Sequence, residues 1–212
     1  MGSEVSVRVS DIDCEVSTSS NLVSVSPGVW VGSLETTTQE LLSHDTDRML
    51  AALQESNGAD AVLSYVFVRD LLCMVTPGEN IFSLPTLSNL EAMARNMFVP
   101  ASTRRLLSTP QLRAFLSGSF RAWGKDMVRE GFHYLAVISA PEGQQSKPHL
   151  LDIEVPSASV PAPDHHLAQV VNVELVPGRI VLHKTTLQYR LSCNCLSSDP
   201  REGLLLVDGY IW

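Results

Sequence analysis

RIVLHKTTLQYRLSCNC, residues 179–195, decides how the C-terminal part of the chain is expected to fold. In its second half, apolar or sulfur-bearing side chains occupy every second position and polar side chains occupy the positions between them. The first set comprises Leu187, Tyr189, Leu191, Cys193 and Cys195, and the second comprises Gln188, Arg190, Ser192 and Asn194. Alternate side chains of a β-strand point to opposite faces, so this stretch predicts a strand with one buried face.

The same alternation continues through the rest of the chain after Gly131. It is seen in FHYLAVISA (132–140), HLLDIEV (149–155), AQVVNVELV (168–176) and GLLLVDGYI (203–211). Pro177-Gly178 forms a turn signal between two of these segments. Successive strands joined by short turns indicate an antiparallel sheet, here of about five to six strands.

Residues before Gly131 show a different pattern, in which apolar side chains recur at helical spacing. The segments 36–56, 84–100 and 109–131 are each predicted to form a helix, and 59–75 a buried strand or strand pair. The N-terminal segment SEVSVRVSD (3–11) alternates again and predicts a strand. We therefore expect a single α+β domain over residues 1–212, with an N-terminal β segment (1–36), a mainly helical part (37–130) and a C-terminal antiparallel sheet (131–212).

Histidine and cysteine residues near the opening stretch raise the question of a metal site. The candidate ligands are Asp164, His165, His166, His183, Cys193 and Cys195. Structural zinc sites mostly use cysteine pairs that are two to four residues apart on turns, and a Cys-x-Cys pair on one strand does not have that spacing. We predict core-facing cysteines, solvated histidines, and neither a metal nor another cofactor.

One region has a charge opposite to that of the whole chain. Residues 95–129 carry a charge of +6, whereas the net charge of the 212 residues is −8. On a helix over 110–130, the basic residues Arg113, Arg121, Lys125 and Arg129 would lie on one side, opposite an apolar face. This pattern is typical of an amphipathic basic helix that either is simply solvated or binds an acidic protein, a second subunit, a phosphate backbone or an anionic membrane. The overall negative charge argues against nucleic-acid binding by the rest of the surface.

The N-terminus MGSEVS fits the N-myristoylation pattern, with Gly2 as the acceptor and Ser6 in place. One acyl chain binds membranes only marginally, so the basic helix would be needed as a second signal. Acidic residues at 11, 13 and 15 count against this reading. With no basic and apolar leader at the start of the chain and no long apolar run, we expect an intracellular, cytoplasmic protein that could attach peripherally to a membrane.

Motif spacing does not identify an enzyme. The chain has no Gly-x-Ser-x-Gly elbow, no phosphate-binding Gly-rich loop and no His-Glu-x-x-His motif. Charged residues make up 18% of the chain, below the roughly 25% that is usual, and charge is depleted in interface cores. We therefore predict a non-enzymatic structural or interaction protein that self-associates or binds a protein partner, and whose composition is compatible with a viral structural or accessory protein. The alternative is an enzyme or small-ligand-binding protein with a site on the C-terminal sheet near Asp164, His165, His166 and His183.

Overall fold

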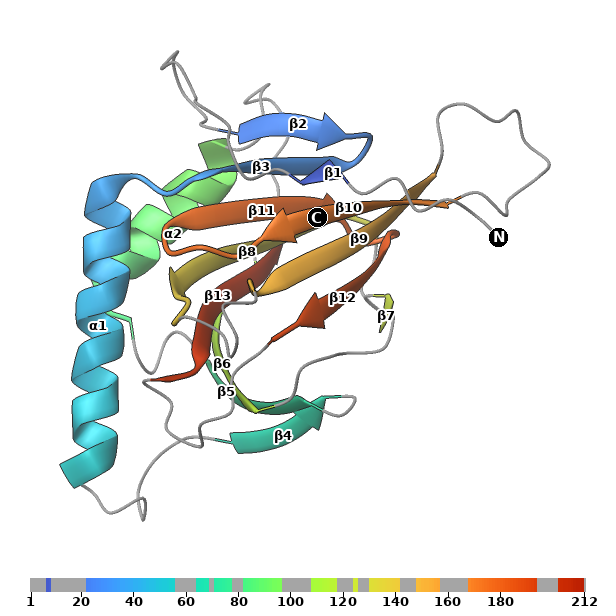
Figure 1. Ribbon diagram of the computed structural model, residues 1–212. Helices are drawn as coiled ribbons and strands as arrows, with labels where there is room; N and C mark the ends of the chain where they lie inside the picture. Colours follow the sequence, from blue (N-terminus) through green and yellow to red (C-terminus); the bar gives the residue numbers. More distant parts are fainter. Residues whose placement is uncertain are drawn as a thin grey trace.

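The computed structural model contains two facing β-sheets and a pair of helices against one of them (Figure 1). It describes residues 7–8, 22–55, 64–68, 71–77, 82–96, 108–117, 124–125, 130–141, 148–156, 168–193 and 202–211. The N-terminal elements are β1 (Val7–Arg8), β2 (Leu22–Ser26), β3 (Val29–Ser33), α1 (Thr36–Glu55), β4 (Ser64–Val68), β5 (Leu71–Pro77) and α2 (Leu84–Asn96). They are followed by β6 (Gln111–Ser117), β7 (Gly124–Lys125), β8 (Phe132–Ser139), β9 (Leu150–Pro156), β10 (Ala168–Glu174), β11 (Arg179–Lys184), β12 (Gln188–Ser192) and β13 (Leu204–Ile211).

The larger sheet has eight strands in the order β2-β3-β11-β8-β13-β6-β5-β4, and the smaller has five in the order β1-β10-β9-β12-β7. All neighbouring strands are antiparallel except β1 and β10, which are parallel. From β6 onward the chain passes repeatedly between the two sheets, and β13 lies between β8 and β6 in the larger one. Two antiparallel sheets connected in this way form a jelly roll.

The main core lies between the two sheets. Leu135, Val137 and Leu206 of the larger sheet pack with Leu151 and Ile153 of the smaller one, and all five are buried. A second core fills the space between the larger sheet and the helices, where α1 and α2 contribute Leu42, Leu50 and Leu90. The middle strands of the larger sheet are therefore buried on both faces.

A carboxylate of α1 fixes the start of α2. Asp45 accepts hydrogen bonds from the Ser83 backbone N–H (2.7 Å) and from the Thr86 hydroxyl (2.6 Å). Burial would raise the pKa of Asp45, but these hydrogen bonds and the nearby Arg48 guanidinium hold it below its ordinary value. Asp45 thus satisfies backbone and hydroxyl donors at a helix N-terminus, as a capping residue does, although it comes from another helix.

Two glycines occupy positions that other residues would not fit. Gly178, in the turn between β10 and β11, has a φ of 80°, which confirms the turn predicted at Pro177-Gly178. Gly209 lies opposite Tyr134 across the β13–β8 pair. A Cβ atom on Gly209 would stand 2.5 Å from the Tyr134 hydroxyl oxygen, and Tyr134 is itself buried. The close approach of the ring to this backbone requires glycine at 209.

The predicted α+β class with a helical centre is wrong, because the described chain is mostly β-sheet. The helices predicted within 36–56 and 84–100 are confirmed as α1 and α2, and the segments predicted as strands after Gly131 form β8 to β13. These strands do not form the single C-terminal sheet that we predicted, because β8, β11 and β13 belong to the larger sheet and β9, β10 and β12 to the smaller one. The helix predicted over 109–131 is the main error, since this region contains strands β6 and β7. β6 is buried on both faces, so its apolar residues do not alternate cleanly with polar ones. The spacing of its apolar residues was therefore also compatible with a helix.

Candidate functional site

Polar side chains gather inside the jelly roll where β6, β8, β11, β12 and β13 come together. The strand pairing sets His133 of β8 directly between His183 of β11 and Tyr210 of β13. His133 and His183 lie on the same face of their strands as Leu135 and Val181, which belong to the core between the sheets, so they face the interior of the jelly roll. Tyr189 of β12 meets them from the smaller sheet, with its ring centroid 5.6 Å from that of His133 and 5.0 Å from that of His183. We refer to His133, His183, Tyr189, Asp208, Tyr210 and Arg113 as the interior cluster.

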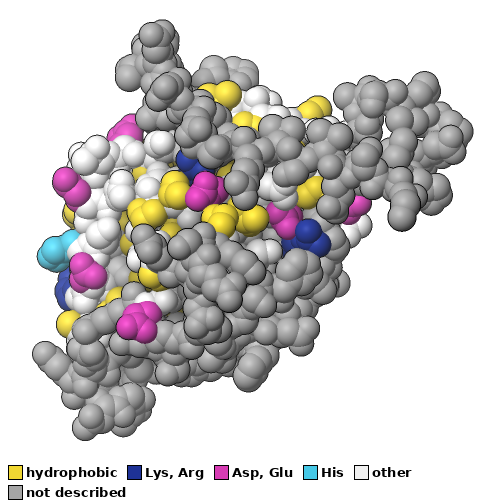
Figure 2. All heavy atoms as spheres, viewed as in Figure 1, with side chains coloured by type: hydrophobic (Ala, Val, Ile, Leu, Met, Phe, Trp, Pro, Cys, Tyr) yellow, Lys and Arg dark blue, Asp and Glu magenta, His cyan; other side chains and the backbone are white. Residues whose placement is uncertain are grey.

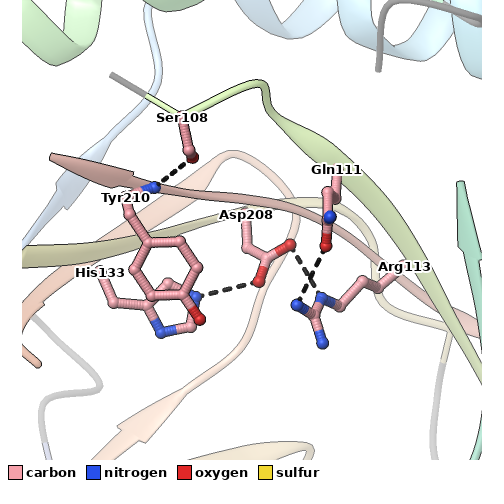
Figure 3. A network of polar contacts seen from close by, with 6 residues as sticks. All are labelled: Ser108, Gln111, Arg113, His133, Asp208 and Tyr210. Atoms are coloured by element: carbon pink, nitrogen blue, oxygen red, sulfur yellow. Dashed lines mark hydrogen bonds and ion pairs between the residues drawn. The ribbon is translucent and has the colours of Figure 1, made fainter. Parts of the chain in front are cut away.

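Asp208 is the charged centre of the interior cluster (Figure 3). Its Oδ1 accepts a hydrogen bond from Arg113 Nε (2.8 Å), and its Oδ2 lies 2.9 Å from His133 Nε2. Asp208 and His133 are each only 2% exposed, whereas the Arg113 side chain is 20% exposed. Burial would raise the pKa of Asp208, but the hydrogen bond from His133 and the charge of Arg113 hold it below its ordinary value. Asp208 is therefore a carboxylate that stays ionised inside the protein.

The partner of each histidine in the cluster can only accept a hydrogen bond, so it fixes a proton on one ring nitrogen. The Asp208 carboxylate accepts from His133 Nε2, and the Lys184 carbonyl oxygen, 3.0 Å away, accepts from His183 Nδ1. In a neutral imidazole the other nitrogen then carries a lone pair. These atoms, His133 Nδ1 and His183 Nε2, are buried.

Aromatic contacts hold the two imidazole rings in place. The centroids of the His133 and His183 rings are 5.1 Å apart at an interplanar angle of 72°. The Tyr210 ring stacks on His133 at 4.6 Å and 16°. Ser108 fixes the backbone of Tyr210 by donating its own N–H to the Tyr210 carbonyl oxygen and accepting the Tyr210 N–H at its hydroxyl. The cluster is thus rigidly positioned by strands that are distant in the sequence.

A second buried ion pair lies on the outer face of the smaller sheet. Arg190 Nε of β12 donates to Asp152 Oδ2 of β9 at 2.6 Å, and Asn172 of β10 donates to the same carboxylate. Asp152 is 3% exposed although it alternates with residues of the interior core. This pair joins three neighbouring strands on the face of the smaller sheet opposite to the interior cluster.

The structure places the predicted site residues in different surroundings from those expected. His183 is not solvated but fully buried, whereas Cys193 is buried as predicted. Arg113 lies on strand β6, not on a helix, and pairs with Asp208. For Lys125 only the backbone in β7 is described. The remaining candidates lie outside the described residues: Gly2, Arg121, Arg129, Asp164, His165, His166 and Cys195.

Figure 2 shows one face of the molecule, on which the described Lys and Arg side chains are scattered and form no continuous basic patch. Binding of an acidic partner, a second subunit or a membrane by the four basic residues stays a prediction. Among the described helices, none is long and apolar enough to cross a membrane.

Sequence reasoning missed His133, Asp208, Tyr189 and Tyr210 as members of a site. Each of the first two is the only residue in a largely apolar strand, FHYLAVIS or LLLVDGYI, whose ordinary pKa lies below about 7. An ionisable side chain in a strand that is predicted to be buried needs a partner, and this was the signal available in the sequence.

No family model matches the sequence, and no curated protein matches it. Solved structures with a similar fold do exist. They include a prolyl hydroxylase from Trichoplax adhaerens in complex with a peptide of hypoxia inducible factor (10% identity, covering 87% of this chain and 83% of that one, TM-score 0.58). They also include the non-heme alpha-ketoglutarate-dependent epimerase SnoN of nogalamycin biosynthesis (13% identity, covering 87% of this chain and 77% of that one, TM-score 0.59). A third is an oxidoreductase of the 2OG-Fe(II) oxygenase family from Burkholderia pseudomallei (13% identity, covering 87% of this chain and 85% of that one, TM-score 0.51).

At these identities the similarity shows the fold, which is the jelly roll of 2-oxoglutarate/Fe(II) oxygenases. It overturns the prediction of a non-enzymatic structural, interaction or viral protein, because these neighbours are enzymes. It favours the alternative that we named, an enzyme or small-ligand-binding protein. His183 is the one residue of that alternative that the structure describes, and it lies in the interior cluster.

Iron in non-heme oxygenases is held by two histidines and one carboxylate on one side of the metal. Within the described parts of the chain, no group of three or more His, Cys, Asp or Glu residues is arranged to hold a metal ion. His133, His183 and Asp208 have the required residue types, but Asp208 already binds His133 and Arg113 through its two oxygens. The interior cluster therefore does not fit the iron that the fold implies.

Proposed function

We propose that the protein is an enzyme that acts on a small organic molecule bound between the two sheets, at the interior cluster. The observation that carries this proposal is the burial of an ionised carboxylate, an arginine and two histidines inside the jelly roll. Burial of charge is unfavourable compared with an apolar core, and replacing a buried ion pair by apolar residues is often neutral or stabilising. Such a cluster is therefore a candidate for a functional site.

The location of the cluster supports the same proposal. Ligand sites in β-barrel-like folds lie at the mouth of the barrel, where a few polar groups fix the orientation of the ligand. Gln111, Arg113 and Tyr210 are only partly buried, so the cluster reaches the surface on their side. SnoN, with a similar fold, has been solved in complex with Fe3+, alpha ketoglutarate and a nogalamycin compound.

A second candidate is a 2-oxoglutarate/Fe(II) oxygenase, which the solved neighbours favour. It would need a set of iron ligands that the described residues do not provide. We therefore derive no step through iron and base the proposal on the residues of the interior cluster.

A thermal-shift screen of small organic molecules, with 2-oxoglutarate among them, tests the proposal. The variant His133→Gln alters the cluster, and His149→Gln serves as its matched control. His149 is also a buried histidine, but its Nε2 pairs with the Pro141 carbonyl oxygen on another part of the fold. We expect compounds that raise the melting temperature of the wild type and of His149→Gln but not of His133→Gln. Compounds that stabilise all three proteins equally, or a screen with no stabilising compound, would contradict the proposal.

A further inference from the structure

The central side chains of the interior cluster are closed to solvent. His133, Asp208 and His183 are 2%, 2% and 0% exposed, whereas Arg113 and Tyr210 at the edge of the cluster are only partly buried. A small organic molecule therefore reaches His133 only if part of this cover moves.

The contact of Tyr210 with the cluster is of a kind that opens more easily than that of Arg113. The Tyr210 ring stacks on the His133 ring, with the centroids 4.6 Å apart and an interplanar angle of 16° (Figure 3). Arg113 instead donates to the buried Asp208 carboxylate at 2.8 Å. Aromatic stacking is weaker than a buried ion pair, and moving Arg113 would leave Asp208 without its arginine.

Tyr210 also lies where the sheet ends on one side. Asp208 pairs with Gln111, the first residue of β6, and Tyr210 is two residues further along β13. β6 therefore does not run alongside Tyr210. Ser108 still fixes the Tyr210 backbone from that side, since it donates to the carbonyl oxygen and accepts the N–H at its hydroxyl. With the backbone held, movement of Tyr210 is confined to rotation of its side chain.

We propose that the Tyr210 ring is a gate over His133, which closes the interior cluster when it stacks on the imidazole and admits a substrate when it turns away. This inference rests on the proposed function and adds the way in which the site opens. Minor open states of proteins are populated at about 0.1–10%. Because stacking closes the site, phenylalanine at position 210 should close it and alanine should leave it open.

Solvent access to His133 in the ligand-free, full-length protein tests the gate. TEMPOL, a soluble nitroxide, speeds the relaxation of carbon-bound ring protons of exposed histidines, and His133→Gln assigns the signals. We expect Tyr210→Ala to raise this effect at His133 by about tenfold or more, because a site open at most about 10% of the time becomes open throughout. Tyr210→Phe should match the wild type.

Tyr189→Ala is the matched control. Tyr189 also contacts the His133 ring, at 5.6 Å, but it comes from the smaller sheet and is only 6% exposed. Its removal should not increase access of TEMPOL to His133. Equal access in Tyr210→Ala and the wild type, or an equal increase in both alanine variants, would overturn the inference. If Tyr210→Ala does not fold, Tyr210→Leu, which also lacks the ring, takes its place.

Carbon relaxation dispersion at the His133 ring distinguishes a moving gate from a fixed cover. We expect exchange on the microsecond to millisecond timescale in the wild type and in Tyr210→Phe, and its loss in Tyr210→Ala. Absence of exchange in the wild type, or exchange that persists without the ring, would reject the gate. Neither measurement uses a ligand. The gate can therefore fail while compounds still stabilise the protein through His133, which would leave the proposed function intact.

Discussion

Replacement of Asp208 by asparagine is expected to destabilise the fold strongly, because it removes the negative charge of β13 that pairs with Arg113 of β6 and His133 of β8. The carboxylate is 2% exposed and holds Arg113 of β6 and His133 of β8 at 2.8 and 2.9 Å. Removing one partner of a fully buried ion pair destabilises a protein by about 3–5 kcal/mol. Solvent reaches the Arg113 side chain, which is 20% exposed, so we take a value at the lower end, about 3 kcal/mol.

Urea denaturation followed by circular dichroism measures this loss. With a slope of about 2 kcal/mol per molar, a loss of about 3 kcal/mol moves the midpoint by about 1.5 M. Asp47→Asn is the matched control, since Asp47 is exposed on α1 and its replacement should change stability by less than about 0.5 kcal/mol. Arg113→Met combined with Asp208→Asn should be less destabilising than the sum of the two single changes, by about 1–3 kcal/mol.

The effect of Asp208→Asn depends on pH in a direction set by its pKa. Hydrogen bonding and charge lower the pKa of Asp208 in the folded protein below its ordinary value of 3.8. Its contribution is therefore complete above that value and is lost as the pH falls through the lower, folded pKa. The difference in stability between wild type and Asp208→Asn should be constant near neutral pH and should shrink in acid. A loss of stability below about 1 kcal/mol for Asp208→Asn at neutral pH would refute the reasoning. Strictly additive effects of Arg113→Met and Asp208→Asn would refute it as well.

Three further substitutions probe other parts of the fold by urea denaturation. Gly209→Ala should destabilise by about 2–3 kcal/mol because the added Cβ meets the Tyr134 ring, and a Tyr134→Ala background should remove most of this effect; an undiminished effect there would contradict the account. Asp45→Ala should destabilise the protein by about 1–2 kcal/mol at neutral pH, because it removes the side chain that caps α2. Since the pKa of Asp45 is lowered in the folded protein, the difference in stability between wild type and Asp45→Ala should shrink in acid. A difference that stays constant with pH would contradict this account of the cap. Arg190→Met should destabilise by about 2–3 kcal/mol, because it leaves the buried Asp152 carboxylate without its arginine, and a neutral outcome would show that this carboxylate does not need it.

The sequence predicted those elements whose pattern matches their surroundings. α1 and α2 each cover one face of a sheet, so their apolar residues recur at helical spacing. β9, β10 and β12 have one face in the core between the sheets, and their side chains alternate accordingly. β6 has both faces buried, with Phe115 in one core and Leu112 and Ala114 in the other, and its local pattern could not distinguish strand from helix.

The candidate site was beyond the reach of sequence spacing for a different reason. Asp208 and His133 are 75 residues apart, and Asp208 and Arg113 are 95 residues apart. Only the sheet order, in which β13 lies between β8 and β6, brings these three side chains together. Periodicity predicts strands but not their order in a sheet, so Arg113 was assigned to an exposed basic surface when its charge is neutralised inside the protein.

The position of β13 between β8 and β6 has a consequence for synthesis of the protein on the ribosome. β8 ends at Ser139 and β13 begins at Leu204. The edges of β6 and β8 that pair with β13 are therefore synthesised before β13 and stay unpaired until it is made. At a translation rate of about 5–20 residues per second, this interval lasts about 3–13 s. During that time the nascent chain exposes two unpaired edges of apolar strands, which are prone to pair with other chains. Newly made molecules should therefore depend on chaperones, and chains terminated before β13 should aggregate.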